Sequence, residues 1–251
     1  MNWDDFPNDL IALSDPLAGF GETQGTAEAL WSIAGALKSS WRINRTLRSS
    51  TAIPIPAPRN KALFPAACEV DVAELSFIFE LGENIDEDLI PARSDFQVCV
   101  RGCAIYEKST VELEDHWRVD THVHTDGPPP WEPHSIVHFQ RGGHAQDAFA
   151  SGAQFIPGHA LPQNAQGASW LSLLQSPGPR VPFPPYCPVL AIDYTIGQHD
   201  GPLFRQLRNL PEYARIVRRA QQRLWLPFFD ALSKNAKVRD KWLGDLIVPS
   251  I

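Results

Sequence analysis

Hydrophobic and polar residues alternate with different periods along the chain, and each period predicts a type of element. In residues 26–50, Leu30, Ala34 and Leu37 recur at helical spacing, and cationic residues gather toward the end of the segment, where the helix dipole favours them. We therefore expect an amphipathic helix over 26–50. Residues 1–25 mix acidic residues, proline and glycine, and are interpreted as a lead-in with one short helical turn.

Residues 70–144 change to a period of two, which is the period of β-strands. The first strand alternates from residue 73 to 81, the second begins at Phe96, the third carries Trp117 and Val119 on its apolar face, and the fourth covers 134–141. Gly102 suggests a bulge in the second strand. We expect an antiparallel four-stranded meander with one apolar face and one polar face.

The remainder of the chain divides into a loop-rich part, 145–188, and a helical part, 189–251. Periodicity leaves the state of residues 189–194 open. A helix is expected over 202–235, kinked or restarted at Pro227, with a short last helix at 239–246. The chain is therefore predicted to be a single α+β domain, 1–251, in which the meander is flanked by an N-terminal helix and C-terminal helices.

Composition narrows the classes of function. The net charge of −7 argues against general affinity for nucleic acid, and the sequence has no stretch of 18 apolar residues that would span a bilayer. Four cysteines are too few for a disulfide scaffold at this length, and the acidic start lacks the pattern of a secretion signal. We expect a cytoplasmic protein with reduced thiols.

Histidines supply the strongest local bias, because seven of the eight lie between positions 116 and 159. His122 and His124 share one face of the third strand with Asp120 and Glu114, since side chains at i and i+2 point the same way about 6–7 Å apart. If the fourth strand pairs so that apolar faces match, His138 joins that polar face.

This histidine-rich hairpin, residues 116–144, has two chemical interpretations. Imidazoles with a carboxylate are a ligand set for zinc or another divalent metal, and we take His122, His124, His138 and His134 as candidate ligands. The same histidines with Asp120 and Glu114 also suit metal-free acid–base catalysis. A third possibility is structural, because a polar strand face is often only solvated.

Cys103 is a further candidate, as a nucleophile working with a histidine of the neighbouring strand. Cys99 and Cys103 share a face if no bulge separates them, and the favoured interpretation of both is as buried thiols that act as small hydrophobic groups.

Several segments resemble a pattern in uncharacterised bacterial proteins that accompany ubiquitin-like conjugation components in antiviral-defence operons. They include residues 134–143, 179–185 and 190–194. The resemblance implies a site containing His134 and His138 and a protein partner of a ubiquitin-like or defence system. The order of elements is also similar to that of ubiquitin-conjugating enzymes, but no His-Pro-Asn motif precedes a cysteine after the fourth strand.

Two functions follow as hypotheses. The first is a hydrolase, metal-dependent or not, that uses the histidine-rich hairpin to cleave a peptide or isopeptide bond, with a phosphodiester as the next choice. The second is a non-catalytic adaptor that binds a protein partner, in which the histidines are structural or solvated. An enzyme requires these side chains to converge on one point in a cleft, whereas an adaptor requires an exposed apolar patch.

Overall fold

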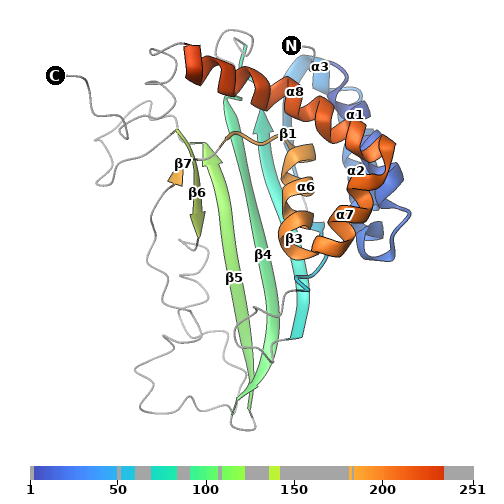
Figure 1. Cartoon of the computed structure of the whole chain (residues 1–251), viewed down its shortest axis with the longest axis vertical. Helices are drawn as coiled ribbons and strands as arrows, with labels where there is room; N and C mark the ends of the chain where they lie inside the picture. The colour runs from blue at the N-terminus through green and yellow to red at the C-terminus, as the bar shows by residue number, and fades with distance from the viewer. Residues whose placement is uncertain are drawn as a thin grey trace, which may run out of the picture.

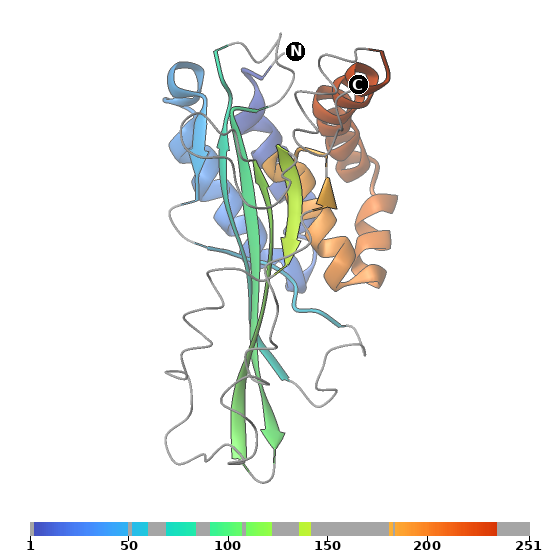
Figure 2. The same ribbon diagram turned by 90° about the vertical axis from the view of Figure 1, so that its left-hand side faces the viewer.

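The computed structural model consists of a long antiparallel sheet with helices packed on one face of its upper half (Figure 1). The central strands continue beyond the helical layer at the other end (Figure 2). The structure describes residues 3–49, 52–59, 69–83, 91–106, 109–121, 136–141, 181–182 and 184–234.

The four-stranded meander is confirmed and forms the centre of the sheet. Its strands are β3 (Glu69–Glu80), β4 (Arg93–Tyr106), β5 (Ser109–Thr121) and β6 (Val137–Arg141), each antiparallel to the next. Three shorter strands extend it. They are β1 (Thr46–Arg48) and β2 (Ile53–Pro54), which both pair with β3, and β7 (Val181–Pro182), which pairs with β6.

The N-terminal region contains more structure than predicted. Residues interpreted as a lead-in form the helix α1 (Phe6–Leu17), followed by a 3₁₀ turn, η1 (Gly21–Thr23). Helical periodicity was present, because Phe6, Leu10, Leu13 and Leu17 are all buried. Two prolines obscured it: Pro7 lies in the first turn, where proline is tolerated, and Pro16 lies close to the end.

The helix predicted over 26–50 is shorter and is broken. It comprises α2 (Gln24–Leu37) and the single turn α3 (Trp41–Asn44), and the chain then enters β1. Arg45 adopts a left-handed conformation, with φ of 48°, directly after α3. This conformation ends the helical path, so the prediction was wrong beyond residue 37 except for α3.

Up to residue 234, the last one described, the C-terminal part is helical, as predicted. Residues 189–194, whose state was open, belong to α6 (Pro188–His199), which is followed by α7 (Gly201–Asn209) and α8 (Pro211–Lys234). Pro227 lies inside α8 and does not restart it. The short helix expected at 239–246 lies outside the described residues. No helix in the described part of the chain is long and apolar enough to cross a membrane.

The hydrophobic core lies between the sheet and the helices. The alternation predicted for β3 is confirmed, because Leu75, Phe77 and Phe79 are buried while their neighbours in sequence are half-buried. Phe79 packs against Trp3 and Phe6 with ring centroids 5.4 and 5.5 Å apart. Burial of such rings contributes much of the stability of a domain of this size.

The bulge expected near Gly102 is present, but the extra residue belongs to β3. The β3–β4 register shifts between Val70 and Val72, opposite Arg101 and Gly102. The β4–β5 register runs without interruption through this point. Cys99 and Cys103 therefore lie on the same face of β4.

His199, at the end of α6, is an ionisable residue that connects the helical layer to the segment after β2. His199 is buried, and its Nδ1–H donates to the carbonyl oxygen of Pro56 at 2.8 Å. The pKa of His199 is lowered, because burial disfavours the imidazolium more than the bond to Pro56 and the charge of Asp115 favour it.

We expect the free energy of unfolding to fall on acidification below about pH 6.5, the ordinary pKa of histidine. In that range the unfolded chain binds a proton at His199 that the folded chain resists, which favours unfolding. His199→Gln keeps an N–H donor but does not titrate. Urea unfolding between pH 5 and 8 should show a shallower pH dependence for this variant than for the wild type. Equal slopes would contradict the assignment.

Candidate functional site

The register pairs Asp120 of β5 directly with His138 of β6. The neighbouring residues Val119 and Phe139 point toward the helical layer. Asp120 and His138 therefore belong to the opposite face of the sheet, which points away from the helices and which we call the open face. Asp120 is 8% exposed and His138 is fully buried. Two of the residues singled out from the sequence are therefore side by side.

The remaining histidines of the predicted metal centre, His122, His124 and His134, lie outside the described residues. Within the described ranges no group of three histidine, cysteine, aspartate or glutamate side chains is arranged to hold a metal ion.

Glu114 and Cys103 share the open face but lie far from Asp120. Glu114 precedes Asp120 by six positions on β5, which corresponds to about 20 Å along an extended strand. It forms an ion pair with Arg101 at 3.3 Å. Cys103 pairs with Glu112, still further along β5. The structure therefore does not bring these two residues to the place where Asp120 and His138 meet.

Cys99, by contrast, has a histidine as its register partner, His116. Burial, followed by the charge of Glu114, raises the pKa of Cys99 to about 11. The thiol is thus protonated at neutral pH, and such a thiol is a poor resting nucleophile. The pKa of the buried Cys187 is likewise raised by burial to about 11.

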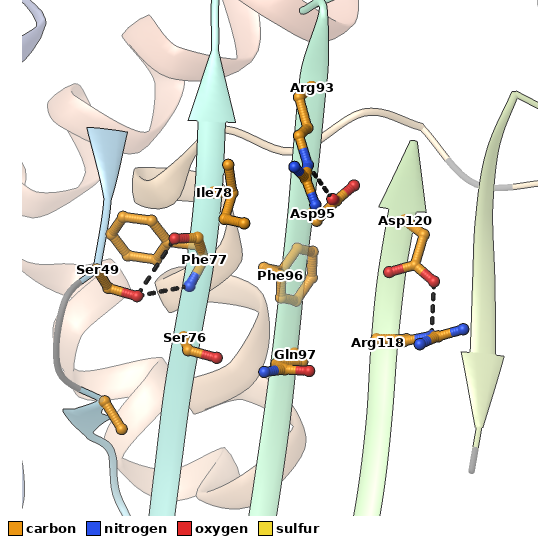
Figure 3. Close-up of a pocket in the computed structure, with 11 residues that line it drawn as sticks. Ser49, Ser76, Phe77, Ile78, Arg93, Asp95, Phe96, Gln97, Arg118 and Asp120 are labelled. Carbon is orange, nitrogen blue, oxygen red and sulfur yellow. Dashed lines mark hydrogen bonds and ion pairs between the residues drawn. The ribbon is translucent and has the colours of Figure 1, made fainter. Parts of the chain in front are cut away.

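A pocket of about 560 Å³ opens on the same face over β3, β4 and β5 (Figure 3). Its volume falls in the range of small-molecule sites. The residues that line it are Ser49, Ala52, Ser76, Phe77, Ile78, Arg93, Asp95, Phe96, Gln97, Arg118 and Asp120.

Asp95 and Asp120 lie next to each other across β4 and β5 in this pocket. The paired register of β4 and β5 ends at Phe96 and Val119, and Asp95 and Asp120 each lie one position beyond that pair on their own strands. Both side chains line the pocket. Asp95 is fixed by the backbone N–H of Thr121, which donates to its Oδ1 at 2.8 Å.

Each carboxylate has an arginine on its own strand. The Nε of Arg93 lies 2.5 Å from Oδ2 of Asp95, and the Nε of Arg118 lies 2.6 Å from Oδ2 of Asp120. Figure 3 shows both ion pairs side by side. Arg118 also donates to the Oε1 of Gln140 at 3.0 Å. The pocket therefore holds two positive and two negative groups at neutral pH.

Aromatic residues in α6 and just before it fix the strands beneath these charges. Phe96, which follows Asp95, packs against Tyr186 with ring centroids 5.2 Å apart. Trp117, which precedes Arg118, packs edge-on against Tyr194 at 5.8 Å. Because strand side chains alternate, aromatic anchors on one face hold the charged residues in place on the other.

Sequence reasoning missed Asp95 and Arg93, because the second strand was predicted to begin at Phe96. The sequence did contain a signal, because Arg93, Asp95 and Gln97 are separated by two positions each and so share one face of β4 up to its start. Arg118 alternates in step with Glu114 and Asp120 along the third strand, but it was not among the predicted site residues.

Comparison with known proteins identifies no relative of this chain. No family model matches it, and neither the curated proteins nor the solved structures give a significant match.

Proposed function

We propose that the chain is a hydrolase whose active site is the pocket on the open face, with Asp120 as the catalytic carboxylate. The observation that carries the proposal is the presence of Asp95 and Asp120, on neighbouring strands, in one pocket that also holds two arginines. Carboxylates and guanidinium groups together provide what hydrolysis needs, namely a base for water and a cation for the developing oxyanion.

The roles of the residues follow from their positions. Asp120 takes a proton from water as the water oxygen attacks the carbonyl carbon of an amide substrate. Arg118, 2.6 Å from Asp120, stabilises the negative charge on the carbonyl oxygen. The proton then passes to the leaving amine nitrogen as the C–N bond breaks. His138 is fully buried and acts through Asp120 as a positioning residue.

The substrate class that we propose is an amide, as in a peptide or isopeptide bond, with phosphodiesters as the second class to assay. The choice of amides rests on the resemblance to proteins of ubiquitin-like conjugation systems. A metal is not part of this mechanism. Metal analysis of protein purified without a histidine tag, beside a His138→Ala variant, tests separately whether the histidine-rich hairpin holds zinc.

Replacing Asp120 by asparagine is expected to lower kcat for amide hydrolysis by about 100-fold or more, because general acid–base groups typically contribute this much. The matched control is Asp115→Asn. Asp115 lies on the same strand and also pairs with an arginine, Arg141, at 2.9 Å, but it belongs to the other face. Hydrolysis of a panel of fluorogenic peptides and isopeptides measures both variants.

The control variant should retain the wild-type rate to within about twofold, since it removes an exposed ion pair of small energetic value. Equal loss in both variants would point to damage of the sheet, and an unchanged rate in Asp120→Asn would exclude Asp120 as the catalytic base.

A second candidate function is the adaptor, which one observation favours. Leu226 and Phe229 are 64% and 52% exposed, and at i and i+3 they are neighbours on the surface of α8. Exposed apolar neighbours of this kind are typical of protein-binding surfaces. Absence of turnover on every substrate of the panel would make the adaptor the better proposal.

A further inference from the structure

The outer side of α8 carries a row of exposed residues that are spaced three or four positions apart. We call this row the α8 stripe, and its members are Arg215, Arg218, Gln222, Leu226 and Phe229. Residues at this spacing share one side of a helix, and the stripe is about 21 Å long. The opposite side of α8 is buried, where the helix packs against α1, α6 and α7 (Figure 1). The α8 stripe therefore faces away from the core.

The two halves of the α8 stripe differ in chemistry. In the N-terminal half, Arg215 and Arg218 form no ion pair with the described residues, whereas the next two arginines of α8 both pair with Asp9. In the C-terminal half, Leu226 and Phe229 are large apolar side chains that are mostly exposed. Arginines and exposed apolar residues side by side are typical of a surface that a protein partner covers.

The spacing of the α8 stripe is symmetric about Gln222. Arg218 and Leu226 lie equally far on either side of Gln222, and so do Arg215 and Phe229. When two copies of a helix pack antiparallel about a twofold axis, a residue before the centre faces the residue equally far after the centre in the other copy. With the axis at Gln222, each arginine of one copy faces an apolar residue of the other.

The opposed residues are chemically complementary. Arg215 comes to lie over the ring of Phe229 of the second copy, which is a cation–π arrangement, and the aliphatic stem of Arg218 packs on Leu226. Asp230 follows Phe229 and is exposed, so the same guanidinium also gains an anionic neighbour. A parallel arrangement would instead place each arginine against its own counterpart, and the two would repel each other.

We infer that two copies of the chain associate through the α8 stripe, antiparallel about a twofold axis at Gln222. This inference goes beyond the hydrolase proposal and does not depend on it. It also accounts for the exposure of Leu226 and Phe229 without the partner of an adaptor. A contact limited to one pair of helices buries less than the roughly 1,200 Å² of a standard interface, so we expect a weak dimer, with a dissociation constant on the order of tens of μM.

Sedimentation equilibrium of the full chain, from about 5 to 500 μM, measures this dissociation constant. Phe229→Arg places an arginine against Arg215 at both ends of the contact, and we expect it to weaken association at least about tenfold. Arg215→Phe combined with Phe229→Arg exchanges the two residues within one chain. One arginine then again faces one phenylalanine, so the double variant should associate to within about threefold of the wild type.

The matched control is Trp31→Arg. Trp31 is an exposed aromatic residue of α2 and lies outside the α8 stripe, so its replacement introduces the same charge on a different helix. Association should remain within about twofold of the wild type. All of the substituted side chains are exposed, and circular dichroism checks that each variant is folded.

A dimer that weakens in Phe229→Arg and recovers in the double variant would support the antiparallel contact. A monomer at every concentration would overturn the inference and leave the α8 stripe to a different partner, such as an acidic protein segment. Equal weakening in Trp31→Arg, or a failure of the double variant to recover, would also overturn it, because the contact would then not oppose Arg215 and Phe229. None of these outcomes bears on the hydrolase, which the Asp120→Asn assay tests.

Discussion

Replacing Asp193 by alanine is expected to lower the free energy of unfolding by about 3–5 kcal/mol, the typical cost of breaking a buried ion pair from one side. Asp193, on α6, is 4% exposed. Its Oδ1 accepts from the Nε of Arg208 on α7 at 2.9 Å and from the hydroxyl of Tyr213 on α8 at 3.1 Å. One carboxylate thus joins three helices.

The loss should be large because two donors would remain without their acceptor. Tyr213 is fully buried, and burial together with Asp193 raises its pKa well above the ordinary value, so the phenol stays protonated and needs an acceptor. Arg208 also forms a second contact with Asp193 through its terminal nitrogen. Asp193→Asn, which keeps one acceptor oxygen and the shape of the side chain, should lose less than Asp193→Ala.

Urea unfolding followed by circular dichroism measures these differences. The matched control is Asp230→Ala, because Asp230 forms an exposed i,i+4 ion pair with Lys234 on α8, and such pairs contribute about 0.5 kcal/mol or less. A loss below about 1 kcal/mol in Asp193→Ala would mean that the three helices are held by apolar packing alone.

The Asp193 cluster illustrates what periodicity can and cannot predict. Burial of Leu203, Leu207, Ile216 and Val217 follows from helical spacing, and the helical nature of this region was predicted. An aspartate in the apolar run around residues 189–194 has no partner that can be identified from the sequence. Its partners come from two later helices, and only packing in three dimensions brings them together.

The sheet was predictable for a related reason. Strands β3 to β6 are long enough to show a period of two, whereas β1, β2 and β7 have only two or three residues each and carry no such signal. Parity placed Asp120 and His138 on one face, and the register pairs them. Alternation alone does not show which residues along that face meet in a pocket, because this depends on how the neighbouring strands are aligned.

The candidate site therefore differs in part from the predicted one. Glu114 and Cys103 have the correct parity, but they lie toward the opposite end of β5 and β4 from Asp120. Arg93 and Asp95 lie in the first residues of β4, before Phe96, where the predicted strand began. His122, His124 and His134 are outside the described residues, and their place in a metal centre stays a prediction.

Replacing Gly102 by valine is expected to lower the free energy of unfolding by about 3 kcal/mol, the upper part of the range for overpacked sites. Gly102 lies where β4 faces the bulge of β3. A Cβ atom at this position would overlap the carbonyl oxygen of Glu69 and lie 2.9 Å from the Cα of Val70. These are backbone atoms, so no side-chain rotation can relieve the overlap.

The physical consequence is local separation of β3 from β4 beyond the helical layer. Amide hydrogen exchange should accelerate in β3 near Glu69 and Val70, while the part of β4 around Phe96, held from behind by Tyr186, should remain protected. The control is Gly35→Ala in the exposed face of α2, where a Cβ meets nothing within 4 Å. Alanine there should stabilise the protein by about 0.5–1 kcal/mol.

The Gly102→Val variant also separates the stability of the hairpin from the integrity of the site. Gly102 is seven positions from Asp95 along β4, or about 23 Å on an extended strand. If the pocket depends on the strands anchored by the helices, amide hydrolysis should persist in the folded fraction of this variant with an unchanged KM. Loss of hydrolysis in step with loss of β3–β4 pairing would instead mean that the site requires the whole length of the sheet.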